Sequence, residues 1–86
     1  MSAAEGVVRV RLFAAAKAAA GVAEVLLEPG TIASISVELI ARYPALATVL
    51  PACSFLIDGV QPSDPGGVAF IVAGSVLDVL PPFAGG

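Results

Sequence analysis

An alternation of apolar and charged residues near the start of the chain is its clearest structural signal. Residues 8–12 are Val-Arg-Val-Arg-Leu, which has the two-residue period of a strand with one buried face. The three apolar residues would share the buried face. Arg9, Arg11 and the following Phe13 would share the opposite, outer face.

A short helix is predicted directly after this strand. The alanine-rich stretch 14–20, with Lys17 at its centre, has high helix propensity, and Gly21 is a suitable helix stop. So short a helix is not stable alone, so it must pack against the rest of the fold.

A second strand is predicted at residues 23–28, where apolar and polar positions alternate again. If the two strands pair, the arginines of the first can meet Glu24 and Glu28 across the outer face. A solvated sheet face without further role is the other interpretation of these charges.

The main helix is predicted at residues 32–43, after a Pro29-Gly30 turn. Thr31 is a suitable N-cap, and Pro44 ends the helix. Apolar residues recur at helical spacing along it, namely Ile32, Ile35, Leu39, Ile40 and Tyr43. Because its β-branched residues weaken the intrinsic propensity, packing on a sheet must stabilise this helix.

A third strand and a hairpin follow a loop or helical turn at residues 45–50. Residues 53–57 predict the strand, and Asp58-Gly59 favours a type I′ hairpin turn. Residues 60–61 can form a short return strand.

The last strand is predicted at residues 76–80, where Leu77 and Val79 would share one face and Val76, Asp78 and Leu80 the other. Before it lie a loop at 62–67, an apolar stretch at 68–72 whose structure is ambiguous, and a turn at 73–75. The alternation places Asp78 and Leu80 together on one face of the strand.

One helix covering one face of a mixed sheet is an α+β arrangement. The order of elements suits the β-grasp, or ubiquitin-like, fold, with a sheet of about four to five strands and the last strand beside the first. We expect one β-grasp domain at residues 7–80, a flexible tail at 81–86 and disorder at 1–6.

The composition is unusually apolar for so small a domain. Of its 86 residues, 58% are hydrophobic and only 13% are charged. The longest stretches without charge, 43–57 and 65–77, are shorter than the roughly 18–20 residues that span a membrane. We therefore expect a soluble domain that meets a partner through apolar surface. Since no signal peptide is visible, we expect a cytoplasmic protein.

Charge and residue types exclude several classes of function. Four basic residues against seven acidic ones provide no positive surface for nucleic acid. Histidine is absent, so the serines lack the commonest activating base. The single cysteine, Cys53, lies in an apolar strand and is expected to be a buried, inert thiol. We expect no metal site and no bound cofactor.

The C-terminal residues are the best candidates for chemistry. Pro81 and Pro82 favour an extended exit from the last strand, and Phe83 offers one apolar anchor. Ala84, Gly85 and Gly86 have almost no side-chain bulk, so the end could thread into a narrow channel of another protein. Adenylation would make the terminal carboxylate reactive. An unstructured glycine end without function is the alternative.

Three segments resemble the MoaD family, the small subunit of molybdopterin synthase, and with it the MoaD/ThiS-type ubiquitin-like sulfur carriers. They are residues 8–15 with Lys17 and Gly21, residues 31–32 leading to 41–46, and residues 78–86, which end in Pro-Pro-Phe-Ala-Gly-Gly. The last segment is the most specific, and the resemblance covers nearly the whole chain after residue 6.

The resemblance implies a sulfur carrier in molybdenum cofactor biosynthesis. An E1-like enzyme would use ATP to adenylate Gly86, and a sulfurtransferase would supply the sulfur for a thiocarboxylate. The tail would insert into the large subunit, MoaE, and deliver sulfur to the pyranopterin precursor in a heterotetramer. The chain would then be a non-catalytic subunit of a sulfurtransferase complex.

Other functions share the same terminal chemistry and stay open. The chain could carry sulfur for thiamine, cysteine or tungsten cofactor synthesis, or be a ubiquitin-like modifier of lysines. A third alternative is a plain interaction module whose Gly-Gly end is incidental.

A docking surface can also be predicted from the alternation of side chains. If the first and last strands are neighbours, Phe13 and Leu80 lie on one face, close to Phe83. We expect these three residues to dock MoaE and the E1-like enzyme, with Pro81, Pro82 and Ala84 contributing. Arg11 could pair with Asp78, and Lys17 could meet an acidic group of the partner. Ordinary edge packing is the alternative for Phe13.

Overall fold

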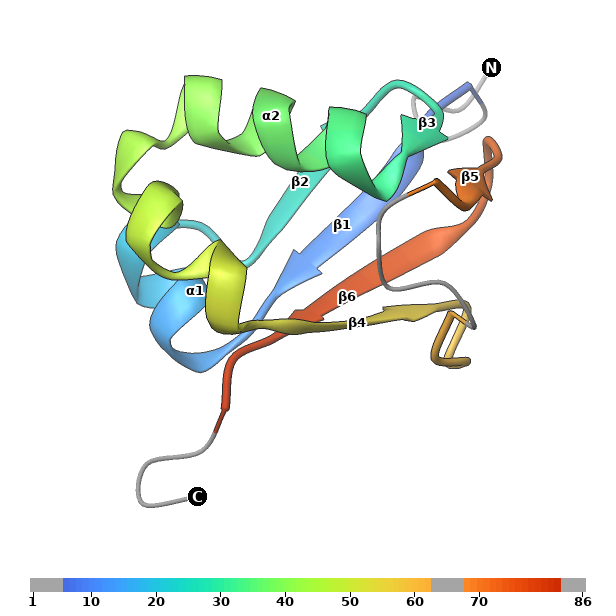
Figure 1. The fold of residues 1–86 in the computed structure, drawn as a ribbon. Coiled ribbons are helices and arrows are strands. Elements are labelled where there is room, and N and C mark those ends of the chain that lie inside the picture. Colours follow the sequence, from blue (N-terminus) through green and yellow to red (C-terminus); the bar gives the residue numbers. More distant parts are fainter. Residues whose placement is uncertain (1–5, 63–67, 83–86) are drawn as a thin grey trace.

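The main sheet contains the first and last predicted strands side by side (Figure 1). The computed structural model describes residues 6–62 and 68–82. Within them, the main sheet has the strand order β2-β1-β6-β4. The bounds of these strands are β1 Val8–Leu12, β2 Glu24–Leu27, β4 Ser54–Ile57 and β6 Val76–Leu80.

Strand β1 occupies a central place because it pairs on both sides. It runs antiparallel to β2 and parallel to β6, with Val10 opposite Val25 on one side and Leu77 on the other. Strand β6 pairs in turn with β4, antiparallel. The buried and exposed residues of β1 alternate strictly, as the sequence predicts. The α+β class and the neighbouring first and last strands are confirmed.

The short helix α1, Ala14–Ala20, joins β1 to β2. It ends at Gly21, whose φ of 79° is left-handed and whose N–H donates to the Lys17 carbonyl at 2.8 Å. This is the predicted glycine stop. The helix buries Ala16 fully.

The main helix α2, Ile32–Arg42, crosses one face of the main sheet (Figure 1). Thr31 caps it, because its Oγ1 accepts the Ser34 N–H at 3.0 Å. Ile32, Ile35 and Leu39 are buried, so the predicted apolar stripe is the contact face. The stretch beyond Pro44 forms two 3₁₀ helices, η1 Pro44–Thr48 and η2 Leu50–Ala52.

A small second sheet was not predicted. Its strands are β3, Gly30–Thr31, and β5, Phe70–Ile71, which pair antiparallel. Two-residue strands are too short to show a period, so the sequence suggested only a turn at Gly30 and left 68–72 undecided. Position 30 favours glycine for a steric reason, because a Cβ there would collide with the Ser34 hydroxyl at the start of α2.

The turn after β4 has the predicted hairpin geometry. Asp58 and Gly59 both have positive φ, 51° and 82°, as a type I′ turn requires. Ile57 and Val60 exchange backbone hydrogen bonds of 2.8 and 3.0 Å across it. The return segment is shorter than predicted, because it pairs only through this one bridge.

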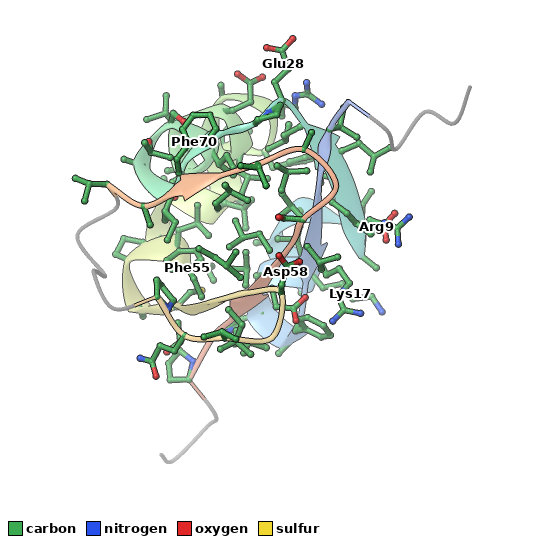
Figure 2. All side chains as sticks on the ribbon, turned by 90° about the vertical axis from the view of Figure 1, so that its right-hand side faces the viewer. Arg9, Lys17, Glu28, Phe55, Asp58 and Phe70 are labelled. Carbon is green, nitrogen blue, oxygen red and sulfur yellow. The ribbon has the colours of Figure 1, made fainter. Side chains whose placement is uncertain are left out.

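The core lies between the main sheet and the helices. Its fully buried large side chains are Val8, Val10, Leu12, Leu39, Leu46, Ile71, Leu77 and Val79. The excess of apolar residues continues onto the surface, where Phe70 (Figure 2) is 63% exposed and its neighbours Val68 and Val72 are similarly exposed. Among the described residues, no helix has the length and apolar character needed to span a membrane.

Candidate functional site

Strand β6 leads directly into the proposed reactive tail. Leu80, half-buried, is its last residue and lies opposite Ser54 of β4. Pro81 is buried and Pro82 is exposed. The predicted tail residues Phe83, Ala84, Gly85 and Gly86 lie outside the residues that the structure describes. The described chain therefore leaves the sheet from a central strand, because β6 pairs with β1 on one side and with β4 on the other.

Phe13 and Leu80 leave neighbouring strands at the same end of the sheet. Leu12 and Val79 are register partners, and each of the two candidate residues follows one of them. Because side chains alternate along a strand, both lie on the outer face of the sheet, the face turned away from α2. Phe13 is 38% exposed, which is high for a phenylalanine. The predicted proximity of these two residues is thus consistent with the observed register.

An ion pair occupies the outer face beside Phe13. Arg11 donates from Nε to Asp78 Oδ1 at 2.6 Å and from Nη2 to Oδ2 at 2.8 Å. The two residues are directly opposite in the β1–β6 register, and Asp78 is only 7% exposed. The hydrogen bonds from Arg11, and then the charge of Asp78, raise the pKa of the guanidinium. The predicted pairing is confirmed.

The pairing of the outer arginines with glutamates is only half right. Arg9 pairs with Glu24 at 3.4 Å, and both side chains are half-exposed. Arg11 instead pairs with Asp78, because a nearly buried carboxylate directly opposite it offers two short, planar hydrogen bonds. Glu28 lies one residue past the end of β2.

Lys17 is exposed on α1, beyond Phe13 along the chain. Figure 2 shows its side chain on the same side of the molecule as that of Arg9. Because Phe13 is the N-cap residue of α1, Lys17 lies one helical turn after it. Its expected contact with an acidic group of a partner remains a prediction.

Cys53 has the environment of an unreactive thiol. It is half-buried at the end of η2, and its thiol donates to the Val49 carbonyl at 3.3 Å. Burial raises the pKa of this thiol. Among the described residues, no group of three or more histidine, cysteine or acidic side chains is arranged to hold a metal ion.

Solved structures of other proteins share this fold. No protein-family model and no curated protein sequence matches the chain. Small archaeal modifier protein 1 (SAMP1) from Methanosarcina acetivorans is 26% identical, with a TM-score of 0.80 over 94% of this chain and 97% of that one. A candidate molybdopterin converting factor subunit 1 from Pyrococcus furiosus is 20% identical, with a TM-score of 0.77 over 90% and 98%.

A third similar structure is a complex. It contains subunits 1 and 2 of the molybdopterin-converting factor from Helicobacter pylori, and the matching chain is 18% identical, with a TM-score of 0.65 over 93% of this chain and 99% of that one. Together these structures confirm the ubiquitin-like β-grasp fold and the resemblance to MoaD/ThiS-type proteins. They do not single out MoaD, because SAMP1 matches equally well.

Proposed function

We propose that this chain is a ubiquitin-like sulfur carrier whose C-terminal glycine is the reactive group, serving molybdopterin synthesis. The observation that carries the proposal is the position of β6. Strand β6 is held between β1 and β4, and the chain continues from it through Pro81-Pro82 into the sequence Phe-Ala-Gly-Gly. The exposed Phe13 follows β1 at the same end of the sheet as Leu80. The sheet thus holds the strand that precedes the tail, and the last three residues of the tail, Ala-Gly-Gly, have little side-chain bulk.

The chemistry requires three steps at one carboxylate. An E1-like enzyme would join the Gly86 carboxylate to the α-phosphate of ATP, with release of pyrophosphate. A persulfide sulfur of a sulfurtransferase would then attack the acyl carbon and displace AMP, and a thiol would cleave the resulting acyl disulfide, leaving a thiocarboxylate and a protein or small-molecule disulfide. Glycine leaves the acyl carbon unobstructed in both steps. The pyranopterin precursor would receive the sulfur within molybdopterin synthase, and the groups that bind it would belong to the large subunit.

The outer face around Phe13 and Leu80 is the proposed docking surface for that large subunit. The Helicobacter pylori structure, in which a chain of the same fold is complexed with the second converting-factor subunit, supports a partner of this kind. Aromatic side chains, phenylalanine included, are enriched at the centres of protein interfaces, so Phe13 is the expected anchor of this surface. We propose that Lys17 contributes a charged contact at the rim of this surface, where exposed charges steer association.

A ubiquitin-like protein modifier is the second candidate function. The similarity to SAMP1, at a TM-score of 0.80, favours it. Both functions begin with an adenylated terminal glycine and diverge at the nucleophile, which is sulfur for a carrier and a lysine amine for a modifier. A carrier for thiamine, cysteine or tungsten cofactor synthesis differs only in the acceptor.

Intact-mass spectrometry distinguishes a sulfur carrier from a protein modifier. The chain would be incubated with the E1-like enzyme of its own genome, ATP and a sulfur source. We expect a mass gain equal to the exchange of one oxygen for sulfur, located at Gly86. A chain lacking Gly86 is the control. No gain with the cognate enzymes contradicts the carrier function, and a lysine-linked conjugate in its place supports a modifier.

The docking surface is tested separately by replacing Phe13 and Leu80 with serine. We expect weaker binding to the large subunit with an unchanged circular dichroism spectrum. Val60→Ser is the matched control, since Val60 is 68% exposed but lies in the turn after β4. Unchanged binding of the Phe13/Leu80 variant removes this surface from the proposal.

A further inference from the structure

Arg11 makes two contacts with one guanidinium group. Its Nε and Nη2 atoms donate to both oxygens of Asp78, and its Cζ lies 5.7 Å from the centre of the Phe13 ring. A two-point bond to a carboxylate fixes the plane of the guanidinium. A cation within about 6 Å of a ring centre attracts the face of the ring. One side chain therefore connects a carboxylate of β6 to the aromatic ring that follows β1.

The three residues differ sharply in exposure. The Asp78 side chain is 10% exposed, whereas that of Arg11 is 49% exposed and Phe13 is 38% exposed. A nearly buried carboxylate needs a partner, and Arg11 is placed opposite it by the strand register. A half-exposed arginine without such a bond samples many rotamers. Asp78 consequently determines where Arg11 lies, and Arg11 limits where the Phe13 ring lies.

We propose that Asp78 is a positioning residue of the docking surface, which holds the Phe13 ring through Arg11. This inference rests on the proposed docking role of Phe13. Asp78 is too buried to make a substantial contact with a partner, so its effect on binding passes through the other two residues. A ring that is already ordered loses less conformational entropy on binding, and the affinity is higher for it.

The positioning is measured on the free chain by nuclear magnetic resonance. In the unmodified chain we expect the Arg11 side-chain protons to be shifted by the Phe13 ring and the Nε proton to exchange slowly with water. Both signatures should be lost in Asp78→Asn, which removes the two-point bond to the guanidinium. Glu38→Gln is the matched control, because it removes an ion pair on α2 that does not involve Arg11. Unchanged Arg11 signals in folded Asp78→Asn would overturn the proposal.

A double-mutant cycle then connects positioning to docking. The variants Phe13→Ala, Asp78→Asn and their combination are titrated with the large subunit encoded in the same genome. We expect Asp78→Asn to weaken binding roughly threefold to tenfold when Phe13 is present, and to have little effect in the Phe13→Ala background. Equal losses in both backgrounds contradict positioning. If Phe13→Ala itself leaves binding unchanged, the proposed docking surface is wrong, while the resonance measurement still decides whether Asp78 orders the ring.

Discussion

Asp58 and Val76 exchange two hydrogen bonds between the hairpin turn and the start of β6. The Asp58 N–H donates to the Val76 carbonyl at 2.8 Å, and the Val76 N–H donates to Asp58 Oδ1 at 2.9 Å. Asp58 also has a φ of 51°, a conformation that aspartate and asparagine tolerate better than most residues. This residue therefore holds the turn in shape and fixes it to the strand that leads to the chain end.

Asp58→Ala should lower the free energy of unfolding by about 1–2 kcal/mol. It removes one hydrogen bond, and alanine has no polar side chain to stabilise the backbone locally at a positive φ. Asp58→Asn keeps both an acceptor oxygen and the tolerance of this conformation, so it should be nearly neutral. Urea denaturation measures both variants. Equal stability of the two would show that the side-chain bond contributes nothing.

Ala14 is expected to behave unusually when replaced by glycine. Its φ of 50° is left-handed although it is the first residue of α1. Ala14→Gly should therefore leave the protein as stable as before or up to about 1 kcal/mol more stable. The exposed neighbour Ala15 is the control, where glycine should cost about 1 kcal/mol of helix stability. Thermal denaturation compares them, and a similar loss at both positions contradicts strain at Ala14.

The cap of α2 can be tested at Thr31. Thr31→Ala should cost about 1 kcal/mol, since the Ser34 N–H loses its acceptor. Thr31→Ser retains the hydroxyl and should preserve most of the stability. The difference between the two midpoints of urea unfolding is the measurement. A Thr31→Ser variant as unstable as Thr31→Ala would assign the effect to the lost methyl group.

The packing of α2 on the sheet is measured by a pair of truncations on opposite faces of the helix. Leu39 is fully buried, so Leu39→Ala should cost about 2–5 kcal/mol. Val37 is 69% exposed, and Val37→Ala should change stability by no more than about 0.5 kcal/mol. Comparable losses at the two positions would mean that the helix is rotated from the orientation described.

Cys53 should react slowly with alkylating reagents near neutral pH. Because burial raises the pKa of the thiol, the folded chain holds less thiolate than the unfolded chain at the same pH. The neutral thiol is favoured in the folded state, so its contribution to stability is complete below the ordinary thiol pKa of about 8.5 and decreases as the pH rises above it. Alkylation rates in buffer and in urea between pH 7 and pH 10 test this. A folded chain that reacts as fast as the unfolded chain at pH 7 contradicts it.

The elements that the sequence predicts well are those with a contrast between polar and apolar positions. Strand β1 alternates arginine with aliphatic residues, and α2 places its large apolar side chains on one stripe, so the period is visible in both. Strand β5 shows the opposite case. Ile71 is fully buried, and its neighbours in the sequence, Phe70 and Val72, are 63% and 58% exposed. All three residues are apolar, so the sequence gives no sign of this alternation in burial.

The candidate site was predictable to the extent that it depends on strand register. Alternation was sufficient to predict the pair of Arg11 with Asp78, because both residues had to lie on the outer face of neighbouring strands. The position of Arg11 over the Phe13 ring was not predictable, since it depends on side-chain rotamers rather than on backbone period. The burial of Pro81 was missed for a related reason, because it arises from packing beyond the end of β6.

The parallel pairing of β1 with β6 has a mechanical consequence. In a parallel pair the start of one strand and the end of the other lie at opposite ends, so the end of β6 is far from the start of β1. A force that pulls the end of β6 away from the start of β1 would act on the hydrogen bonds between the two strands in shear. These bonds would then bear the force at the same time and would have to break together. A partner that grips and draws the tail would therefore meet a body that resists extension, with its last strand anchored on both sides.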